Sequence, residues 1–167
     1  DFTVEAMNIE RFAKHLADDP YIVIPKVHTE YTSETLLVQE HVSGIPGTDV
    51  AAAEAAGLDK KLLAARGAEA LLNMILVDGF FHADPHPGNL RWWNDKIFFL
   101  DMGMVGEVEP NVRELMLLLI LSFSQKDARF LSEVVLLLGA GEGAGEMQDL
   151  EAFRSDLTSL VEKHGAS

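Results

Sequence analysis

The first clear pattern in the chain is an amphipathic helix over residues 4–17. When successive residues are placed 100° apart, Ile9, Phe12 and Leu16 fall on one stripe. Glu5 falls in the middle of the same stripe, so its carboxylate points toward the apolar side. An inward carboxylate needs a cation or a hydrogen-bonding partner, unless this end of the helix frays and leaves it in water. The pattern leaves these two interpretations open.

Other apolar stretches predict the remaining elements. Residues 21–28 and 35–42 suit short strands, although Pro25 restricts the first to an edge. Helices are expected over 49–61 in two short pieces, from 60 to about 80, from 110 to about 123, over about 127–138 and near 147–163, with a flexible loop at 139–145. The longest of these helices should turn a common face inward, made by Ala68, Leu71, Leu72, Ile75 and Leu76.

The pattern switches to strands between the helices at 60–80 and 110–123. The stretch LRWWNDKIFFL reads as a strand, a turn at Asn94-Asp95 and a second strand. With helices dominating elsewhere, we predict an α+β fold that is mostly helical around this short β-hairpin. The longest apolar run, Leu115–Leu121, is far shorter than the roughly 20 residues that a membrane-spanning helix needs. We therefore expect no transmembrane segment in this chain.

Composition narrows the function classes. The chain has 167 residues and a formal net charge of −14, which argues against nucleic acid and against electrostatic docking on anionic lipid. It has no cysteine, which excludes disulfides, thiol nucleophiles and Cys-based zinc sites. The chain begins at Asp1 without a signal-like segment, and we expect it to be a piece of a longer protein.

A cluster of polar and rigid residues follows the longest helix. The stretch FFHADPHPGNL, residues 80–90, contains Asp84 and Asn89, and Asp101 comes directly after the apolar strand that ends the hairpin. A hairpin returns its far end to the edge where it began, so these three side chains should converge. Carboxylate and amide oxygens suit Mg²⁺, and we predict that Asn89 and Asp101 share one ion. The remaining carboxylate, Asp84, could accept a proton from a hydroxyl nucleophile or orient it.

This spacing follows the kinase order of catalytic loop and metal aspartate. Two alternatives use the same residues. His82, Asp84 and His86 could bind Zn²⁺ or iron, since imidazole suits both metals. The stretch could also be a purely structural turn, stiffened by its two prolines.

The sequence resembles the ABC1/UbiB/ADCK atypical kinase family over about residues 1–130. Four stretches carry the resemblance, in the family's order: DFTVEAMNIERF, LLVQEHVSGIPGTD, LLAARGAEALLNMILVDGFFHADPHPGNL and IFFLDMGMVG. The resemblance implies a protein-kinase-like C-terminal lobe in which residues 1–17 form an αC-like helix, 18–48 hold strands and the hinge, and 49–167 form a helical lobe. In this assignment the catalytic loop is 80–90 and the metal motif is 101–103.

The resemblance also implies roles for single residues. Asp84 matches the catalytic-loop aspartate, and Asn89 and Asp101 match the metal-binding pair. Glu5 matches the glutamate that pairs with the nucleotide-positioning lysine. The hinge corresponds to 40–42, so that backbone groups from Glu40 to Val42 would meet adenine. The implied cofactors are ATP and Mg²⁺.

The family's lysine strand and nucleotide loop have no counterpart here, so the resemblance implies that they lie upstream. Without them we expect weak Mg-ATP binding, no turnover by this chain alone, and loose packing of residues 1–17. Only about six residues separate Gly103 from Pro110, too few for the peptide-holding segment of protein kinases. A small molecule, a lipid or water is therefore the expected phosphoryl acceptor.

The resemblance implies an ATP-using kinase or ATPase that supports ubiquinone biosynthesis. It would be a bacterial cytoplasmic or organellar protein, peripheral to a membrane when full-length. An aminoglycoside-type small-molecule phosphotransferase, which has a similar catalytic loop, is one alternative. A non-catalytic scaffold that binds nucleotide is another, although all three metal-site residues are retained.

Overall fold

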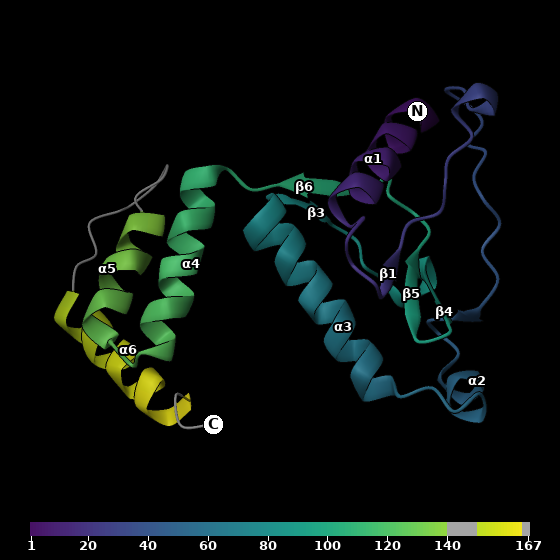
Figure 1. Cartoon of the computed structure of the whole chain (residues 1–167). Coiled ribbons are helices and arrows are strands. Elements are labelled where there is room, and N and C mark those ends of the chain that lie inside the picture. Colours follow the sequence, from purple (N-terminus) through teal and green to yellow (C-terminus); the bar gives the residue numbers. More distant parts are fainter. Residues whose placement is uncertain (140–149, 165–167) are drawn as a thin grey trace. The chain divides into compact units, whose positions relative to one another are not determined.

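The chain forms two compact units, Asp1–Glu107 and Val108–Ser167. The computed structural model describes residues 1–139 and 150–164 (Figure 1). The second unit holds three helices, α4 (Pro110–Ser124), α5 (Ala128–Gly139) and α6 (Leu150–His164), with α5 packed against both others. These confirm the helices predicted there, while nearly all of the predicted loop at 139–145 lies outside the described residues. None of the described helices is both long and apolar enough to cross a bilayer.

The first unit begins with helix α1 (Phe2–His15), whose apolar stripe lies in the core. The Asp1 side chain caps the helix by accepting a hydrogen bond from the Thr3 N–H at 2.9 Å. Ile9 and Phe12 are fully buried, and the Phe12 ring lies 4.6 Å from that of Phe80. The predicted stripe is confirmed. The expectation that residues 1–17 pack loosely is wrong, because this apolar surface stabilises the helix against the core.

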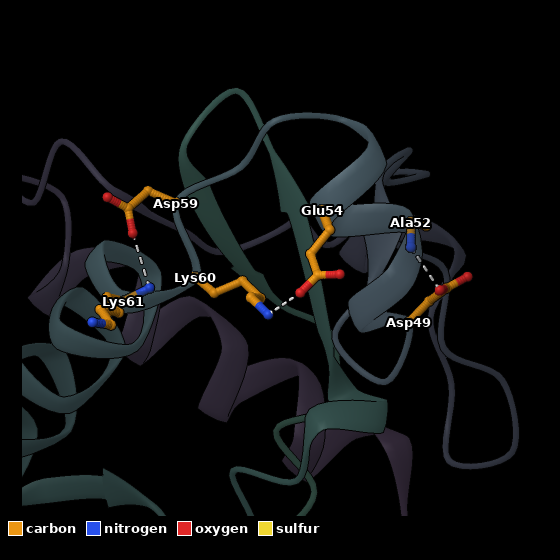
Figure 2. A network of polar contacts seen from close by, with 6 residues as sticks. All are labelled: Asp49, Ala52, Glu54, Asp59, Lys60 and Lys61. Carbon is orange, nitrogen blue, oxygen red and sulfur yellow. Dashed lines mark hydrogen bonds and ion pairs between the residues drawn. The ribbon is translucent and has the colours of Figure 1, made fainter.

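Two aspartates set the starts of the next helices (Figure 2). Asp49 caps α2 (Val50–Ala55) through the Ala52 N–H at 2.9 Å, and Asp59 caps α3 (Lys60–Asn73) through the Lys61 N–H at 3.0 Å. An ion pair between Lys60 and Glu54 joins the two helices across their short connection (Figure 2). The predicted break between the two helical pieces is therefore fixed by local capping.

The long helix ends in a wider turn, η2 (Met74–Asp78), which has π-helical hydrogen bonding. Gly79 closes it with φ of 67°, a left-handed conformation that glycine adopts without strain. The buried positions are Leu63, Ala70 and Met74, whereas Leu72 is 53% exposed. The predicted inward face is thus partly wrong, because the helix packs through the stripe of Leu63, Ala70 and Met74, which leaves Leu72 outside it.

Two small sheets complete the first unit. The larger has the strand order β1-β5-β4-β2, built from β1 (Ile22–Val23), β2 (Ile45–Pro46), β4 (Leu90–Trp93) and β5 (Lys96–Phe99). Strands β4 and β5 form the predicted hairpin, and Asn94 and Asp95 both adopt positive φ in its turn. The smaller sheet pairs β3 (Phe80–His82) with β6 (Val105–Glu107). Gly106 faces the Phe81 ring so closely that a Cβ there would lie 2.4 Å from it.

The strands predicted over 21–28 and 35–42 are shorter than expected. Only Ile22–Val23 forms a strand, and the second segment pairs with the first through one isolated bridge, Val27 with Gln39. A short 3₁₀ turn, η1 (Thr29–Tyr31), lies between the segments. The His28 N–H donates to the Val38 carbonyl at 2.8 Å, and the Glu40 N–H donates to the Lys26 carbonyl at 2.7 Å. Pro25 has no N–H to donate, so the pairing does not extend into a continuous ladder.

Candidate nucleotide and metal site

The predicted catalytic loop runs from β3 through a short 3₁₀ turn, η3 (Pro87–Asn89), into β4. His82 is buried and its Nδ1 accepts a hydrogen bond from the Asp84 N–H at 3.2 Å. Further along, the His86 Nδ1 accepts from the Gly88 N–H at 3.0 Å. Both imidazoles thus hold the loop backbone in shape, while the Asp84 side chain is exposed to solvent.

Burial lowers the pKa of His82, although the nearby Asp101 and Asp84 partly oppose this effect. A neutral imidazole with its Nδ1 already engaged is poorly placed to bind a metal through that atom. Within residues 1–139 and 150–164, no group of three or more His, Asp or Glu side chains is arranged to hold a metal ion. The geometry therefore does not favour the zinc or iron alternative at His82, Asp84 and His86.

The hairpin brings the ends of the loop and of β5 together. The Leu100 N–H donates to the Asn89 carbonyl at 2.9 Å, which places Asp101 one residue beyond this contact. The Asn89 Nδ2 donates to the Asp84 carbonyl at 3.4 Å, and the Asp101 Oδ1 accepts from the Gly103 N–H at 2.9 Å. These bonds leave the Asn89 Oδ1 and the Asp101 Oδ2 without a partner in the described residues. An amide oxygen and a carboxylate oxygen fit Mg²⁺, which binds few protein oxygens and completes its shell with water and phosphate.

Helix α1 contacts Met102 and Gly103, in the predicted metal motif, through two side chains one turn apart. The Asn8 Nδ2 donates to the Met102 carbonyl at 3.1 Å. Glu5 lies beside Gly103, because a Cβ atom added to this glycine would be 3.6 Å from the Glu5 carboxylate. Burial, and then the charge of Asp101, raises the pKa of Glu5, while a hydrogen bond from the Met102 backbone opposes this. Sequence reasoning found Glu5 but missed Asn8, although Asn8 lies three residues later on the same stripe.

A cavity of about 330 Å³ adjoins these residues. Its lining residues are Gln39, Glu40, His41, Val42, Arg91 and Leu100. It therefore contains the predicted hinge, and its wall residue Leu100 directly precedes Asp101 in the chain. Neither Asn89 nor Asp101 is among the lining residues. Sequence reasoning missed Gln39 and Arg91, because nothing in their local pattern shows that they line a shared cavity. A larger cavity of about 420 Å³, between the end of α1 and α3, includes none of the predicted site residues.

Comparison with known proteins identifies relatives across most of the chain. Residues 1–135 match the ABC1 atypical kinase-like domain. The chain is 35% identical over 150 residues to Protein ACTIVITY OF BC1 COMPLEX KINASE 8, chloroplastic, of Arabidopsis thaliana, covering 88% of this chain and 20% of that protein. It is 30% identical over 169 residues to the Probable protein kinase UbiB of Azotobacter vinelandii, covering 98% of this chain and 32% of that protein. The chain thus spans only a fifth to a third of these relatives.

A solved structure shares the fold. The complex of Rv3197 with erythromycin from Mycobacterium tuberculosis aligns with a TM-score of 0.63 and 21% identity, over 99% of this chain and 40% of that one. At this identity the likeness concerns the fold alone, which is α+β and kinase-like, as predicted. The family match covers residues 1–135, including the loop at 80–90, the hairpin and residues 101–103, and on this basis the chain belongs to the ABC1 atypical kinase-like family.

Proposed function

We propose that the protein containing this chain binds Mg-ATP and transfers or hydrolyses its terminal phosphoryl group. The observation that carries the proposal is that one wall of the cavity, at Leu100, is also the end of the hairpin. Glu40, Val42 and Leu100 line the cavity, the Leu100 N–H donates to the Asn89 carbonyl at 2.9 Å, and Asp101 is the next residue along the chain. A base bound in the cavity would therefore have its phosphates directed toward these two oxygen ligands.

The hinge segment offers the backbone groups that an adenine ring needs. The Glu40 N–H is used by the Lys26 carbonyl, but the Glu40 carbonyl and the Val42 N–H have no hydrogen bond within the described part of the chain. An acceptor and a donor on one edge of the cavity complement the 6-amino group and N1 of adenine. This complementarity supports the assignment of Glu40 and Val42 as nucleotide-binding residues.

Each polar side chain of the loop has a defined task in this proposal. Asn89 and Asp101 would hold Mg²⁺, which would neutralise phosphate charge when bound. Asp84 is exposed at the loop and would accept a proton from the attacking hydroxyl or orient it. Glu5 would pair with a lysine from outside the described residues. Such a lysine would also relieve the repulsion between Glu5 and Asp101.

The acceptor is a small molecule, a lipid or water. Residues 105–107 form β6, which pairs with β3, and α4 begins at Pro110. This leaves no room after the metal motif for a segment that could hold a peptide. In line with the relatives named UbiB, we further propose a role of the full-length protein in isoprenoid-quinone biosynthesis.

Replacing Asp84 with Asn in the full-length protein tests the proposal. ATP turnover should fall by roughly 10²- to 10⁴-fold, because the amide cannot take the proton. Nucleotide affinity should be retained, since Asp84 is not assigned to the metal. Turnover by enzymatic assay and affinity by calorimetry give the two readouts. Asp95→Asn is the matched control, because Asp95 is exposed in the hairpin turn and Asn tolerates its φ of 59°.

Undiminished turnover in Asp84→Asn would show that Asp84 has no catalytic role. If the unaltered full-length protein bound no Mg-ATP at all, the assignment of the cavity and of Asn89 and Asp101 would be wrong.

A further inference from the structure

One peptide group in the predicted metal motif is held at both of its polar ends. The Met102 carbonyl accepts a hydrogen bond from the Asn8 Nδ2 at 3.1 Å, and the Gly103 N–H donates to the Asp101 Oδ1 at 2.9 Å. This carbonyl and this N–H belong to the same planar peptide unit and point in opposite directions. A side chain from α1 therefore holds one end of the unit, and the Asp101 carboxylate holds the other.

The backbone alone does not fix the orientation of this peptide unit. Turning the unit over changes only ψ of Met102 and φ of Gly103, and glycine adopts either sign of φ without a steric penalty. Asp101 and Gly103 are exposed, so the turned carbonyl would reach water. It would also face the Asp101 carboxylate in place of the Gly103 N–H. Two acceptors repel each other, so the Asp101 side chain would rotate away from its present position.

Asn8 opposes this change from a fixed position. Its neighbours Ala6 and Ile9 are buried in the core, which holds the part of α1 from which the amide extends. Met102 is fully buried, so water does not reach its carbonyl, and within the described residues no donor other than Asn8 bonds to it. Without the amide this buried carbonyl would lack a partner, and the present orientation of the unit would lose its advantage.

We propose that Asn8 is a positioning residue for the metal site, which fixes the Met102–Gly103 peptide and through it the Asp101 carboxylate. The inference rests on the proposed function, since it assumes that Asp101 binds Mg²⁺ together with Asn89. While the Asp101 Oδ1 is bonded to the Gly103 N–H, its Oδ2 is left to the ion. In this assignment Asn8 contacts neither the ion nor the nucleotide. Its loss should therefore weaken what the metal contributes and leave metal-free nucleotide binding unchanged.

The test measures what Mg²⁺ adds to nucleotide affinity in the full-length protein. Calorimetry with AMP-PNP, an ATP analogue that resists hydrolysis, gives the affinity with Mg²⁺ and with EDTA, and the ratio of the two is the gain due to the metal. Asn8→Leu has a similar volume but no donor. It should reduce this gain by roughly tenfold, as the loss of a group that orients a metal ligand does. The affinity in EDTA should not change.

A matched control makes the same replacement away from the site. Asn73 is an exposed residue at the end of α3, and its side chain forms no hydrogen bond within the described residues. Asn73→Leu should therefore keep the full gain from Mg²⁺. Thermal unfolding without metal checks that each variant is folded. If Asn8→Leu does not fold, Asn8→Ala takes its place with the same expected result, since alanine also removes the donor and favours the helix.

The outcomes separate this inference from the proposed function. If the Asn8 variant keeps the full gain from Mg²⁺, the inference is overturned. It is also overturned if the variant loses affinity equally with Mg²⁺ and with EDTA, because Asn8 would then support the whole site and not the metal ligand. The proposed function stands in both cases. If the unaltered protein binds no AMP-PNP, or gains nothing from Mg²⁺, the proposed function is overturned and the inference with it.

Discussion

Glu5 and Asp101 bring two carboxylates to the same turn of backbone. A Cβ at Gly103 would lie 3.2 Å from the Asp101 Oδ1 and 3.6 Å from the Glu5 Oε2. Within the described residues Glu5 forms no ion pair, so burial and the charge of Asp101 both act to raise its pKa. No cation pairs with the negative charges of Glu5 and Asp101 within the described residues. A lysine or a divalent cation placed beside them would offset these charges.

Replacing Glu5 with Gln should make stability less dependent on pH. A carboxyl whose pKa is higher in the folded state favours folding below its ordinary value of 4.5, and this advantage is lost as the pH rises through the folded pKa. The variant should therefore gain stability relative to the unaltered chain as the pH rises above 4.5, by less than about 1 kcal/mol because water screens a partly exposed group. Urea unfolding between pH 4.5 and 7, without divalent cations, measures the effect.

The matched control is Glu10→Gln, since Glu10 is exposed on the same helix. Its effect should not grow across this pH range. A Glu5→Gln variant that is less stable than the unaltered chain near neutral pH would contradict the assigned repulsion.

A single residue could be predicted from the sequence where its distance along the chain from other residues indicated its chemical role. Glu5 stood out as a charge on an apolar stripe, and Asp84, Asn89 and Asp101 stood out around a hairpin. Their joint metal and catalytic roles stay predictions. Asn8 and Gln39 could not be recognised in this way, because each is defined by a distant backbone carbonyl, at Met102 and Leu100 respectively.

At the scale of elements, helix α1 is held by its aromatic core contact. Phe12 is fully buried against Phe80, so Phe12→Ala should destabilise the chain by about 3–5 kcal/mol through lost burial and a cavity. Denaturant unfolding measures this loss, and Phe12→Leu should give a smaller one if the alanine variant is too unstable to study. Met7→Ala is the control, because Met7 is 69% exposed on the same helix and should change stability by about 0.5 kcal/mol or less. A loss below about 1 kcal/mol for Phe12→Ala would contradict the packing of α1 against the core.

A helix or strand could be predicted where a short local sequence pattern is enough to determine it. The spacing of Ile9, Phe12 and Leu16 gave α1, and the Asn94-Asp95 turn gave the hairpin. The inward face of the helix from 60 to 80 was not predictable, because Ala and Leu side chains lie on several sides of it and tertiary packing selects which of them is buried. Strands β3 and β6 were missed because each has three residues and depends on a partner more than 20 residues away.

At the scale of the whole molecule, the proposed function assigns to this chain one side of a nucleotide site. In that proposal the chain would provide the hinge segment, the cavity for the base, and Asn89 and Asp101 as oxygen ligands. It covers 20% and 32% of the lengths of the two relatives described above. In kinases, affinity also comes from a lysine and a loop that cover the phosphates. Glu5 marks where such a lysine would enter, because its carboxylate lies beside the metal motif with no cation paired to it in the described residues.

The chain alone should therefore bind Mg-ATP weakly and fail to turn it over. Its cavity can hold the base, but within the described residues no lysine pairs with Glu5, and the repulsion between Glu5 and Asp101 opposes further negative charge. Titration calorimetry with Mg-ATP should show a Kd well above ~1 µM for this chain and a much lower one for the full-length protein. The Glu5→Gln variant should bind at least as well as the unaltered chain, since it removes a negative charge beside the phosphates. Micromolar or tighter binding by the unaltered chain would mean that hinge, cavity and metal ligands suffice, and that the lysine opposite Glu5 contributes to catalysis more than to affinity.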